Sequence, residues 1–312
     1  MNFLIYGAGA LGQALGCMLA TAGHNVDLLL RERFINPIRE SGLKVSGIFG
    51  EYVAPMENIH LFSGVNELQS SYDFALITTK SYDTPTAVRD IASLGNEVSF
   101  VVSLQNGCGN LEKLEAGFGP EKSLGARVLT GFEIIAPGVI DITVSADGFH
   151  IGGIRRGSIP DAARKLAEII TAAGHPSEVV EDIHQSLFAK LLYNCTLNPL
   201  GAILGVHYGV LAENEETRKI MDAVIEETFE VIKAVGGRTP WQQAEEYKQF
   251  FYTELIPATY NHRSSMLQDI ENNKPTEVES LIGYVSSKGR LLNVPTPACD
   301  LLSNLIRFKE NQ

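Results

Sequence analysis

The sequence predicts an α/β N-terminal domain with a parallel sheet, followed by an all-α C-terminal domain. Short apolar runs alternate with helical patterns in the first half, and a glycine-rich turn joins the first run to the first helix. Strand patterns end near Pro160, and helical periodicity then continues through the second half. Near-continuous apolar strands that alternate with helices are typical of a parallel sheet covered on both faces.

Each strand expected in the first half is a short apolar run, and several of these runs precede a helical pattern. The expected strands are Asn2–Tyr6, Asn25–Leu30, Phe74–Thr78, Val98–Ser103, Gly125–Val128, Val139–Ser145 and Phe149–Ile151. The expected helices are Leu11–Ala22 and Thr84–Leu94. We expect the last three strands to pair with the later edge of the same sheet.

The second half shows helical periodicity interrupted by proline and glycine. The expected helices are Asp161–Ala173, Asp182–Asn198, Glu215–Val235, Trp241–Phe251, Thr259–Asn272 and Glu277–Leu292. We therefore expect one domain over residues 1–180 and a helical domain over residues 181–312.

The composition argues against several classes of protein. A net charge of −12 disfavours a nucleic-acid-binding surface, which needs a basic face. No stretch has the roughly 20 apolar residues of a membrane span. The four cysteines are widely spaced and have no neighbouring His cluster, so neither a metal site nor a disulfide framework is expected. These features predict a soluble, cytoplasmic protein, and the helical domain offers surface for a homodimer.

The turn after the first expected strand matches the GxGxxG pattern of Rossmann-type dinucleotide-binding domains. It consists of Gly7, Ala8, Gly9, Ala10, Leu11 and Gly12. In this pattern the first glycine permits a tight turn, the second lets the backbone approach a pyrophosphate, and the third lets the helix pack closely on the strand. The unpaired N–H groups that begin the helix suit phosphate. The alternative is a chance glycine-rich turn, which the strand before it and the helix after it make the weaker interpretation.

The end of the second expected strand favours NADP over NAD. NAD-binding domains usually have an acidic residue there for the ribose 2′-hydroxyl, whereas this chain has Arg31, followed by Glu32 and Arg33. A guanidinium can clamp a 2′-phosphate, which a carboxylate would repel. The alternative is that these side chains are solvated loop charges.

A polar stripe lies on an otherwise apolar helix in the second half. Lys190, Asn194 and Asn198 are spaced at i, i+4 and i+8, so a helix sets them on one face. Burying such groups without partners would cost about 1 kcal/mol or more each. They therefore face a polar cavity, bond within the protein or face solvent, and we favour the cavity. The lysine could act as an acid, and the amides could orient a substrate.

Seven segments together resemble the ketopantoate reductase family, in the same order along the chain. They are GAGALG at 7–12, TTK at 78–80, QNG at 105–107, AKLLYNCTLNPLGAI at 189–203, SSMLQDI at 264–270, TEVE at 276–279 and VPTP at 294–297. The resemblance implies NADPH-dependent reduction of 2-dehydropantoate to (R)-pantoate, in the route to pantothenate and coenzyme A. It also implies a Rossmann-type domain, a helical domain and an active site in the cleft between them.

The resemblance also implies roles for individual residues. Lys190 matches the proton donor to the keto oxygen of the substrate, and Glu277 matches a carboxylate near the cofactor and the lysine. Substrate-binding positions are matched by Asn106, Asn194, Asn198 and Ser265. Cofactor contacts are matched by residues 7–12, Arg31, Lys80, Asn106, Glu277 and, across a gap in the match, Gly131.

The chain departs from the family pattern at two places. Tyr208 takes the place of a further substrate-contacting asparagine, and Ser280, Leu281 and Ile282 replace a segment that usually contains Tyr and Asn. Two alternatives to 2-dehydropantoate reduction therefore remain. One is reduction of another small 2-oxo acid, and the other is a non-catalytic NADP-binding sensor, which the intact Lys190 and Glu277 disfavour.

Overall fold

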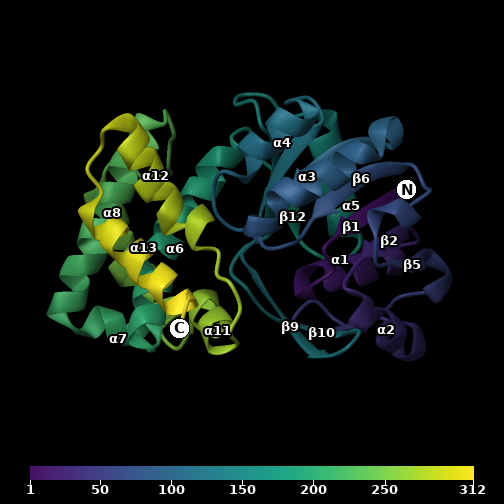
Figure 1. Cartoon of the computed structure of the whole chain (residues 1–312), viewed down its shortest axis with the longest axis horizontal. Helices are drawn as coiled ribbons and strands as arrows, with labels where there is room; N and C mark the ends of the chain where they lie inside the picture. The colour runs from purple at the N-terminus through teal and green to yellow at the C-terminus, as the bar shows by residue number, and fades with distance from the viewer. The chain divides into compact units, whose positions relative to one another are not determined.

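The computed structural model describes residues 1–312, apart from the side chain of Asn96. The chain forms two compact units, which Figure 1 shows in purple to teal and in green to yellow. The first unit contains Met1–Gln105 and Asn110–Ile183, and the second contains Asn106–Gly109 and His184–Gln312. The main division lies beside the boundary expected at residue 180. The short segment Asn106–Gly109 packs with the helical unit, which the sequence pattern does not predict.

The first unit is built on an eight-stranded sheet with the order β12-β11-β8-β7-β6-β1-β2-β5. Its strands are β1 (Asn2–Tyr6), β2 (Asn25–Leu29), β5 (Ile59–Phe62), β6 (Tyr72–Ile77), β7 (Val98–Ser103), β8 (Ser123–Arg127), β11 (Phe149–Gly153) and β12 (Ser177–Val179). All neighbouring pairs are parallel except β8 and β11. From β1 the chain winds outward first to β2 and β5, then to β6, β7 and β8. This order confirms the predicted Rossmann-type fold and places its switch point between β1 and β6.

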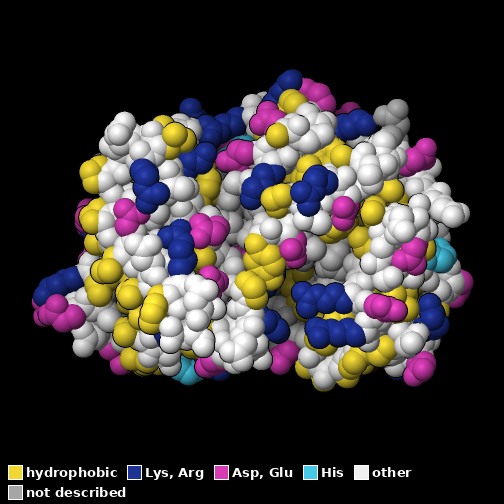
Figure 2. Space-filling model, viewed as in Figure 1, with side chains coloured by type: hydrophobic (Ala, Val, Ile, Leu, Met, Phe, Trp, Pro, Cys, Tyr) yellow, Lys and Arg dark blue, Asp and Glu magenta, His cyan; other side chains and the backbone are white. Residues whose placement is uncertain are grey.

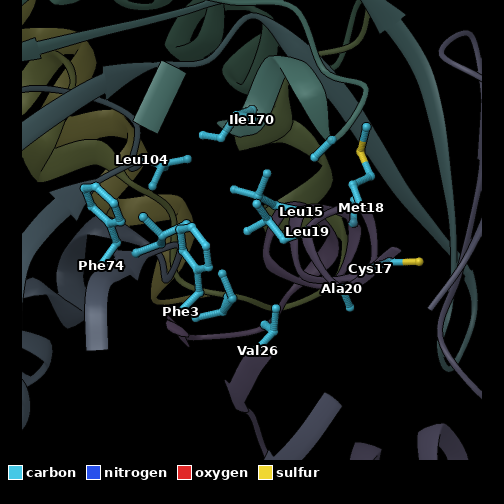
Figure 3. Packing of buried hydrophobic residues seen from close by; sticks show 14 of the residues in the cluster. Phe3, Leu15, Cys17, Met18, Leu19, Ala20, Val26, Phe74, Leu104 and Ile170 are labelled. Atoms are coloured by element: carbon cyan, nitrogen blue, oxygen red, sulfur yellow. The ribbon is translucent and has the colours of Figure 1, made fainter. Parts of the chain in front are cut away.

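The strands are mainly apolar because both faces of the sheet are buried. Along β1, Phe3 and Ile5 join the core under α1 (Ala10–Thr21) and α5 (Asp161–Ala172). Leu4 and Tyr6 instead join the core under α3 (Thr84–Ser93) and α4 (Asn110–Phe118). Figure 3 shows the first of these cores, where Phe3 stacks on Phe74 with ring centroids 5.7 Å apart. Full burial of such a side chain contributes about 2–3 kcal/mol.

A second, four-stranded sheet in this unit has the order β4-β3-β10-β9. Its strands are β3 (Lys44–Gly47), β4 (Tyr52–Val53), β9 (Thr130–Ala136) and β10 (Val139–Ser145). The expectation that Val139–Ser145 pairs with the main sheet is therefore wrong. A tight turn at Pro137 and Gly138 (φ +78°) folds β10 back onto β9, and strand patterning alone does not specify which sheet a strand joins.

The second unit is helical, as the sequence predicts. Its helices are α6 (Ile183–Leu204), α7 (Tyr208–Glu213), α8 (Glu215–Ala234), α9 (Ala244–Phe250), α10 (Ile256–Ala258), α11 (Ser265–Glu271), α12 (Ile282–Leu292) and α13 (Pro297–Glu310). Four boundaries differ from expectation. Helix α6 continues through Pro199, and α9 begins three residues after the predicted start, Trp241. Helix α11 begins at Ser265, after the N-cap Ser264, rather than at Thr259, and α12 begins five residues after the predicted start, Glu277. The expected loss of strands after Pro160 is also wrong for β12, which is too short to show alternation.

The core of the helical unit explains the aromatic residues of α9 and its flanks. Trp241 packs edge-on against Tyr247, with centroids 4.6 Å apart, and Tyr247 lies 5.8 Å from Phe251. These side chains serve packing, as their helical spacing predicts. Among the helices described, none combines the length and apolar character needed to span a bilayer.

Candidate active site

The glycine turn lies at the carboxyl end of β1, beside the switch point of the main sheet. Gly7 has φ +93°, and a Cβ there would lie 2.1 Å from Thr79 Cγ2. A Cβ on Gly12 would lie 2.6 Å from Thr78 Oγ1. The TTK segment after β6 therefore packs directly on the turn, and both glycines are required by this contact.

Gly9 has a different environment from the other two glycines of the pattern. A Cβ at this position would meet no atom closer than Gly7 O, 3.9 Å away. The residue is exposed and caps the N-terminus of α1, whose first turn contains no acidic side chain. Packing within the protein does not explain this glycine, whereas a phosphate close to the backbone does. This open cradle fits a dinucleotide.

Two basic residues expected to contact the cofactor follow strands next to β1. Arg31 is exposed, comes directly after Leu30 at the end of β2, and precedes a single 3₁₀ turn. Lys80 follows β6 and precedes another such turn, which contains Asp83. Burial raises the pKa of the Asp83 carboxyl, and the charge of Arg31 opposes that rise. Both basic residues thus lie at the edge of the sheet where ligands bind in this fold.

Gly131 lies in β9 of the smaller sheet, four residues after the end of β8. A Cβ there would be 2.8 Å from Thr143 Oγ1 and 3.0 Å from Val144 Cγ1 on β10. Close packing of these two strands is a sufficient reason for this glycine.

The QNG segment after β7 connects the two units. The Gln105 amide donates to Thr79 O (3.2 Å), Lys80 O (3.3 Å) and Thr84 Oγ1 (2.9 Å), all in the first unit. The next residues belong to the second unit, where the Cys108 N–H donates to Ser280 O over 2.8 Å. Gly107 has φ +80°, and a Cβ there would lie 2.3 Å from the same carbonyl.

Asn106 joins two charged residues of the helical unit through its amide. Lys190 Nζ donates to Asn106 Oδ1 over 2.6 Å, and Asn106 Nδ2 donates to Glu277 Oε2 over 3.1 Å. Lys190 is half-buried, and Glu277 is only 6% exposed. The three residues come from distant parts of the chain, so the structure brings together the expected proton donor, the expected carboxylate and one expected substrate ligand.

Two further asparagines continue the stripe along α6. Asn194 is 8% exposed and Asn198 is 4% exposed. No described residue provides a hydrogen-bond partner for the Asn194 amide. Asn198 Oδ1 accepts from the Tyr208 hydroxyl, whereas no described residue pairs with its Nδ2. The helix therefore presents two amide donor groups with which no described residue pairs.

Ser265 lies elsewhere in the same unit, at the exposed first residue of α11. The Ser264 hydroxyl fixes the start of this helix by accepting from the Leu267 N–H over 2.9 Å.

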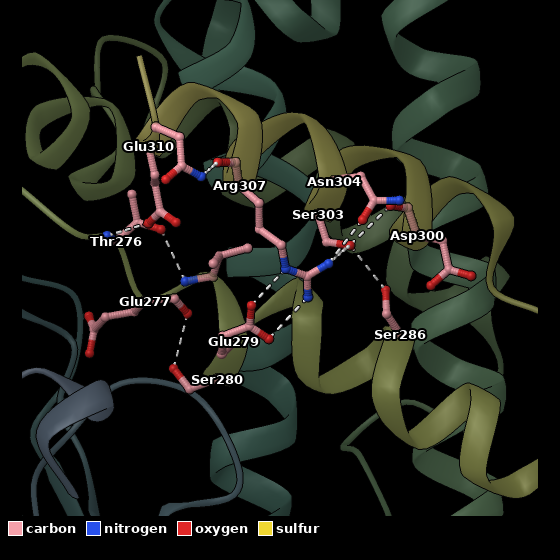
Figure 4. Close-up of polar contacts among 12 residues, drawn as sticks. Thr276, Glu277, Glu279, Ser280, Ser286, Asp300, Ser303, Asn304, Arg307 and Glu310 are labelled. Carbon is pink, nitrogen blue, oxygen red and sulfur yellow. Dashed lines mark hydrogen bonds and ion pairs between the residues drawn. The ribbon is translucent and has the colours of Figure 1, made fainter.

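The segment that carries Glu277 is held on both sides by α13, as Figure 4 shows. The Thr276 N–H donates to Glu310 Oε1 over 2.6 Å. Arg307 donates twice to the Glu279 carboxylate, over 2.7 and 3.0 Å. In Figure 4 the Glu277 side chain points away from this network. These contacts of α13 were not predicted, because they join residues about 30 positions apart.

Comparison with known proteins identifies the family. The model described as "Ketopantoate reductase PanE/ApbA" matches residues 3–155, and that described as "Ketopantoate reductase PanE/ApbA C terminal" matches residues 182–310. The chain is 39% identical over 310 residues to a 2-dehydropantoate 2-reductase of Aquifex aeolicus, covering 99% of this chain and 97% of the relative. It is 32% identical to one of Pyrococcus abyssi, covering 99% and 98%.

Solved structures agree. A PanE/ApbA family ketopantoate reductase from Ralstonia eutropha matches with a TM-score of 0.87 and 29% identity, covering 100% of this chain and 99% of that one. A D-mandelate dehydrogenase, solved with NADH and anilino(oxo)acetate, matches with a TM-score of 0.87 and 27% identity over the same shares. With both family models matched in order and relatives aligned over almost the whole chain, this protein belongs to the ketopantoate reductase family.

Proposed function

We propose that the protein reduces 2-dehydropantoate to (R)-pantoate with NADPH, in the route to pantothenate and coenzyme A. The proposal rests on the hydrogen-bonded chain of Lys190, Asn106 and Glu277. One helical turn from the lysine lies Asn194, whose amide pairs with no described residue. The curated relatives support it, since those aligned over the whole chain are named for this reaction.

Lys190 is proposed as the proton donor to the keto oxygen. Addition to a ketone carbon develops negative charge on that oxygen, and an ammonium stabilises the charge and delivers a proton. Asn106 fixes the lysine through its Oδ1, while Glu277 holds the other end of the Asn106 amide. Glu277 thus orients the lysine through Asn106.

Asn194, Asn198 and Ser265 are proposed to bind the substrate, together with Asn106. Amide N–H groups that have no partner in the protein are costly to bury, and a carboxylate or hydroxyl oxygen offsets that cost. A 2-oxo acid offers such acceptors in its carboxylate and in its keto oxygen. In this proposal the asparagines of the polar stripe orient the substrate, and Lys190 of the same stripe supplies the proton.

The first unit is proposed to bind the cofactor, through residues 7–12, Arg31 and Lys80. The open cradle at Gly9 and the N-terminus of α1 fit a pyrophosphate, and Arg31 supports NADP because a 2′-phosphate needs a cation at the end of β2. When bound, the reduced nicotinamide supplies the hydride for the ketone carbon. Asn106 and Glu277 are further candidates for cofactor contact, and so is Gly131, for which the structure offers a packing explanation.

A second candidate function is reduction of another small 2-oxo acid. It is motivated by Tyr208 and by the structural relative that was solved with anilino(oxo)acetate and NADH. A non-catalytic NADP-binding sensor is the weakest candidate, since Lys190, Asn106 and Glu277 are already connected in the fold.

NADPH absorbance measured with a panel of 2-oxo acids tests these candidates. Oxidation of NADPH that is fastest with 2-dehydropantoate supports the proposed function. Faster oxidation with another acid supports the second candidate. Cofactor binding without oxidation of NADPH by any acid would contradict both reductase functions and favour the sensor. NADH in parallel reactions tests the cofactor.

We further propose that the protein acts in the cytoplasm, with the helical unit offering a homodimer surface. Its four cysteines are buried and unbridged, as in a reducing compartment. On the face drawn in Figure 2, basic side chains occur in small groups among acidic ones, and the net charge is −12. Such a surface gives no support to a nucleic-acid partner.

A further inference from the structure

Tyr208 contacts a residue of the candidate active site directly. It is the first residue of α7, it is 1% exposed, and its hydroxyl donates to Asn198 Oδ1. The ring lies edge-on to Tyr193, with centroids 5.8 Å apart, and 5.2 Å from the ring of His262. The position of the hydroxyl is thus fixed by packing on more than one side.

In this arrangement the Tyr208 hydroxyl uses the oxygen end of the Asn198 amide, and the nitrogen end is the one available to another group. An asparagine amide can rotate by half a turn and exchange its oxygen and nitrogen. With Oδ1 held by the Tyr208 hydroxyl, the NH₂ group points the other way, where no described residue pairs with it. We propose that Tyr208 is a positioning residue, which holds the Asn198 NH₂ group as a donor toward the 2-oxo acid. The proposal rests on the proposed function.

The backbone around Tyr208 supports the same role. Its N–H donates to His262 O over 3.1 Å, and the N–H of Gly209 donates to Tyr260 O over 2.9 Å. The segment 260–262 leads directly to Ser264, which caps α11, and to Ser265. Tyr208 therefore connects the stripe on α6 to the segment that leads into α11, which begins at Ser265.

The hydroxyl also remains a donor over the working range of the enzyme. Burial holds the pKa of Tyr208 well above its usual value, so the phenol keeps its proton. A phenolate could only accept, and would favour the opposite rotamer of the amide.

The test is Tyr208→Phe in the full chain, assayed with NADPH and 2-dehydropantoate. The substitution removes one oxygen and keeps the ring against Tyr193 and His262. We expect KM for the 2-oxo acid to rise by roughly 3- to 10-fold, the usual range for one hydrogen bond, with kcat changed less than about 2-fold. Tyr193→Phe is the matched control, because the Tyr193 hydroxyl lies toward Thr259 rather than Asn198.

A double-mutant cycle separates positioning from packing. In the Asn198→Ala background, Tyr208→Phe should have no further effect on KM, because the amide that it orients is gone. An equal effect in both backgrounds, or a KM unchanged by Tyr208→Phe in an active enzyme, would overturn the positioning role and leave the proposed function intact. A wild-type chain that binds NADPH but turns over no 2-oxo acid would overturn the proposed function, and the positioning role with it.

Discussion

The ammonium of Lys190 donates to the side-chain oxygen of Asn106 over 2.6 Å, although the two residues are 84 positions apart. Lys190 lies on α6, whereas Asn106 lies three residues after Ser103, the last residue of β7. Asn106 belongs to the helical unit because the loop 106–109 docks on Ser280. Lys190 is therefore hydrogen-bonded to a residue that follows a strand of the first unit in the sequence but packs with the helical unit.

Replacing Lys190 by alanine should lower kcat by roughly 10²- to 10⁴-fold, the usual range for loss of a general acid. The expected cause is loss of the proton donor and of the charge that stabilises the developing oxyanion. Steady-state rates with saturating NADPH and 2-dehydropantoate measure the effect. Circular dichroism and NADPH affinity should match the wild type, and near-normal turnover by the folded variant would show that another group supplies the proton.

Replacing Asn106 by alanine should lower kcat by roughly 10- to 100-fold, a smaller loss than at Lys190. The substitution leaves the ammonium in place but removes the amide that orients it and connects it to Glu277, and hydrogen bonds to charged groups contribute about 1.5–3 kcal/mol. A double variant with Lys190→Ala should be no slower than Lys190→Ala alone. Losses that simply multiply would mean that Asn106 acts independently of the lysine.

The sequence predicts the sheet better than it predicts the connections around it. Six strands of the main sheet, β1, β2, β6, β7, β8 and β11, are predicted by their apolar runs, because strands buried on both faces are mainly apolar. The edge strands β5 and β12 and the order of the strands are not predicted. The strand β9 was not predicted, since half of it is exposed and it lacks a regular alternation. Helix α13 was also not predicted, although Pro297 at its first turn is a recognised start signal.

In the candidate site too, features set by helical spacing are predicted from the sequence, whereas contacts made by tertiary packing are not. The stripe of Lys190, Asn194 and Asn198 is visible in the sequence because helical spacing is a local property. The contact between Tyr208 and Asn198 depends on how α7 returns to α6. The clamp of Arg307 on Glu279 likewise depends on the packing of α13. Neither contact has a sequence pattern from which it could be predicted.

Replacing Arg31 by alanine should raise the Kd for NADPH by roughly 10- to 100-fold and leave the Kd for NADH within about 2-fold. The guanidinium is expected to contact the 2′-phosphate, which NADH lacks, and contacts between charged groups of this kind contribute about 1.5–3 kcal/mol. Isothermal titration with both cofactors measures the difference. Arg39→Ala, an exposed residue of α2 (Ile35–Ser41), is the matched control for a general change in charge. Equal weakening of both cofactors would contradict a role in recognising the phosphate.

Replacing Glu227 by alanine should destabilise the helical unit by about 2 kcal/mol. This residue of α8 accepts from the N–H groups of Ala298 and Cys299, each over 2.8 Å, and so caps the N-terminus of α13. A carboxylate at this end also interacts favourably with the helix dipole. Fluorescence of Trp241, the single tryptophan, reports unfolding of this unit in urea. Glu230→Ala, exposed on the same helix, should shift the midpoint far less, and equal shifts would show that the cap is unimportant.

The stability of the first unit should fall as the pH falls below about 6.5, because His175 is buried in its neutral form. The side chain is 1% exposed and its ring centroid lies 3.9 Å from that of Phe149. Its two ring nitrogens lie 2.9 Å from Pro176 O and 3.0 Å from Thr130 Oγ1. Burial lowers the pKa of His175 below the usual value of 6.5. Between those two values the unfolded chain binds a proton that the native unit does not, so protonation favours unfolding.

The contribution of His175 is therefore complete above pH 6.5 and is lost toward the lower, folded pKa, by at most about 1.4 kcal/mol per pH unit. Hydrogen exchange in peptides from β8 and β11, followed from pH 8 to 5, measures the stability of this unit. His175→Gln should be less stable than the wild type at pH 8 but should show a shallower decline below pH 6.5. Some slope should remain, because burial also lowers the pKa of His150. Identical slopes for the wild type and His175→Gln would mean that His175 does not cause the acid sensitivity.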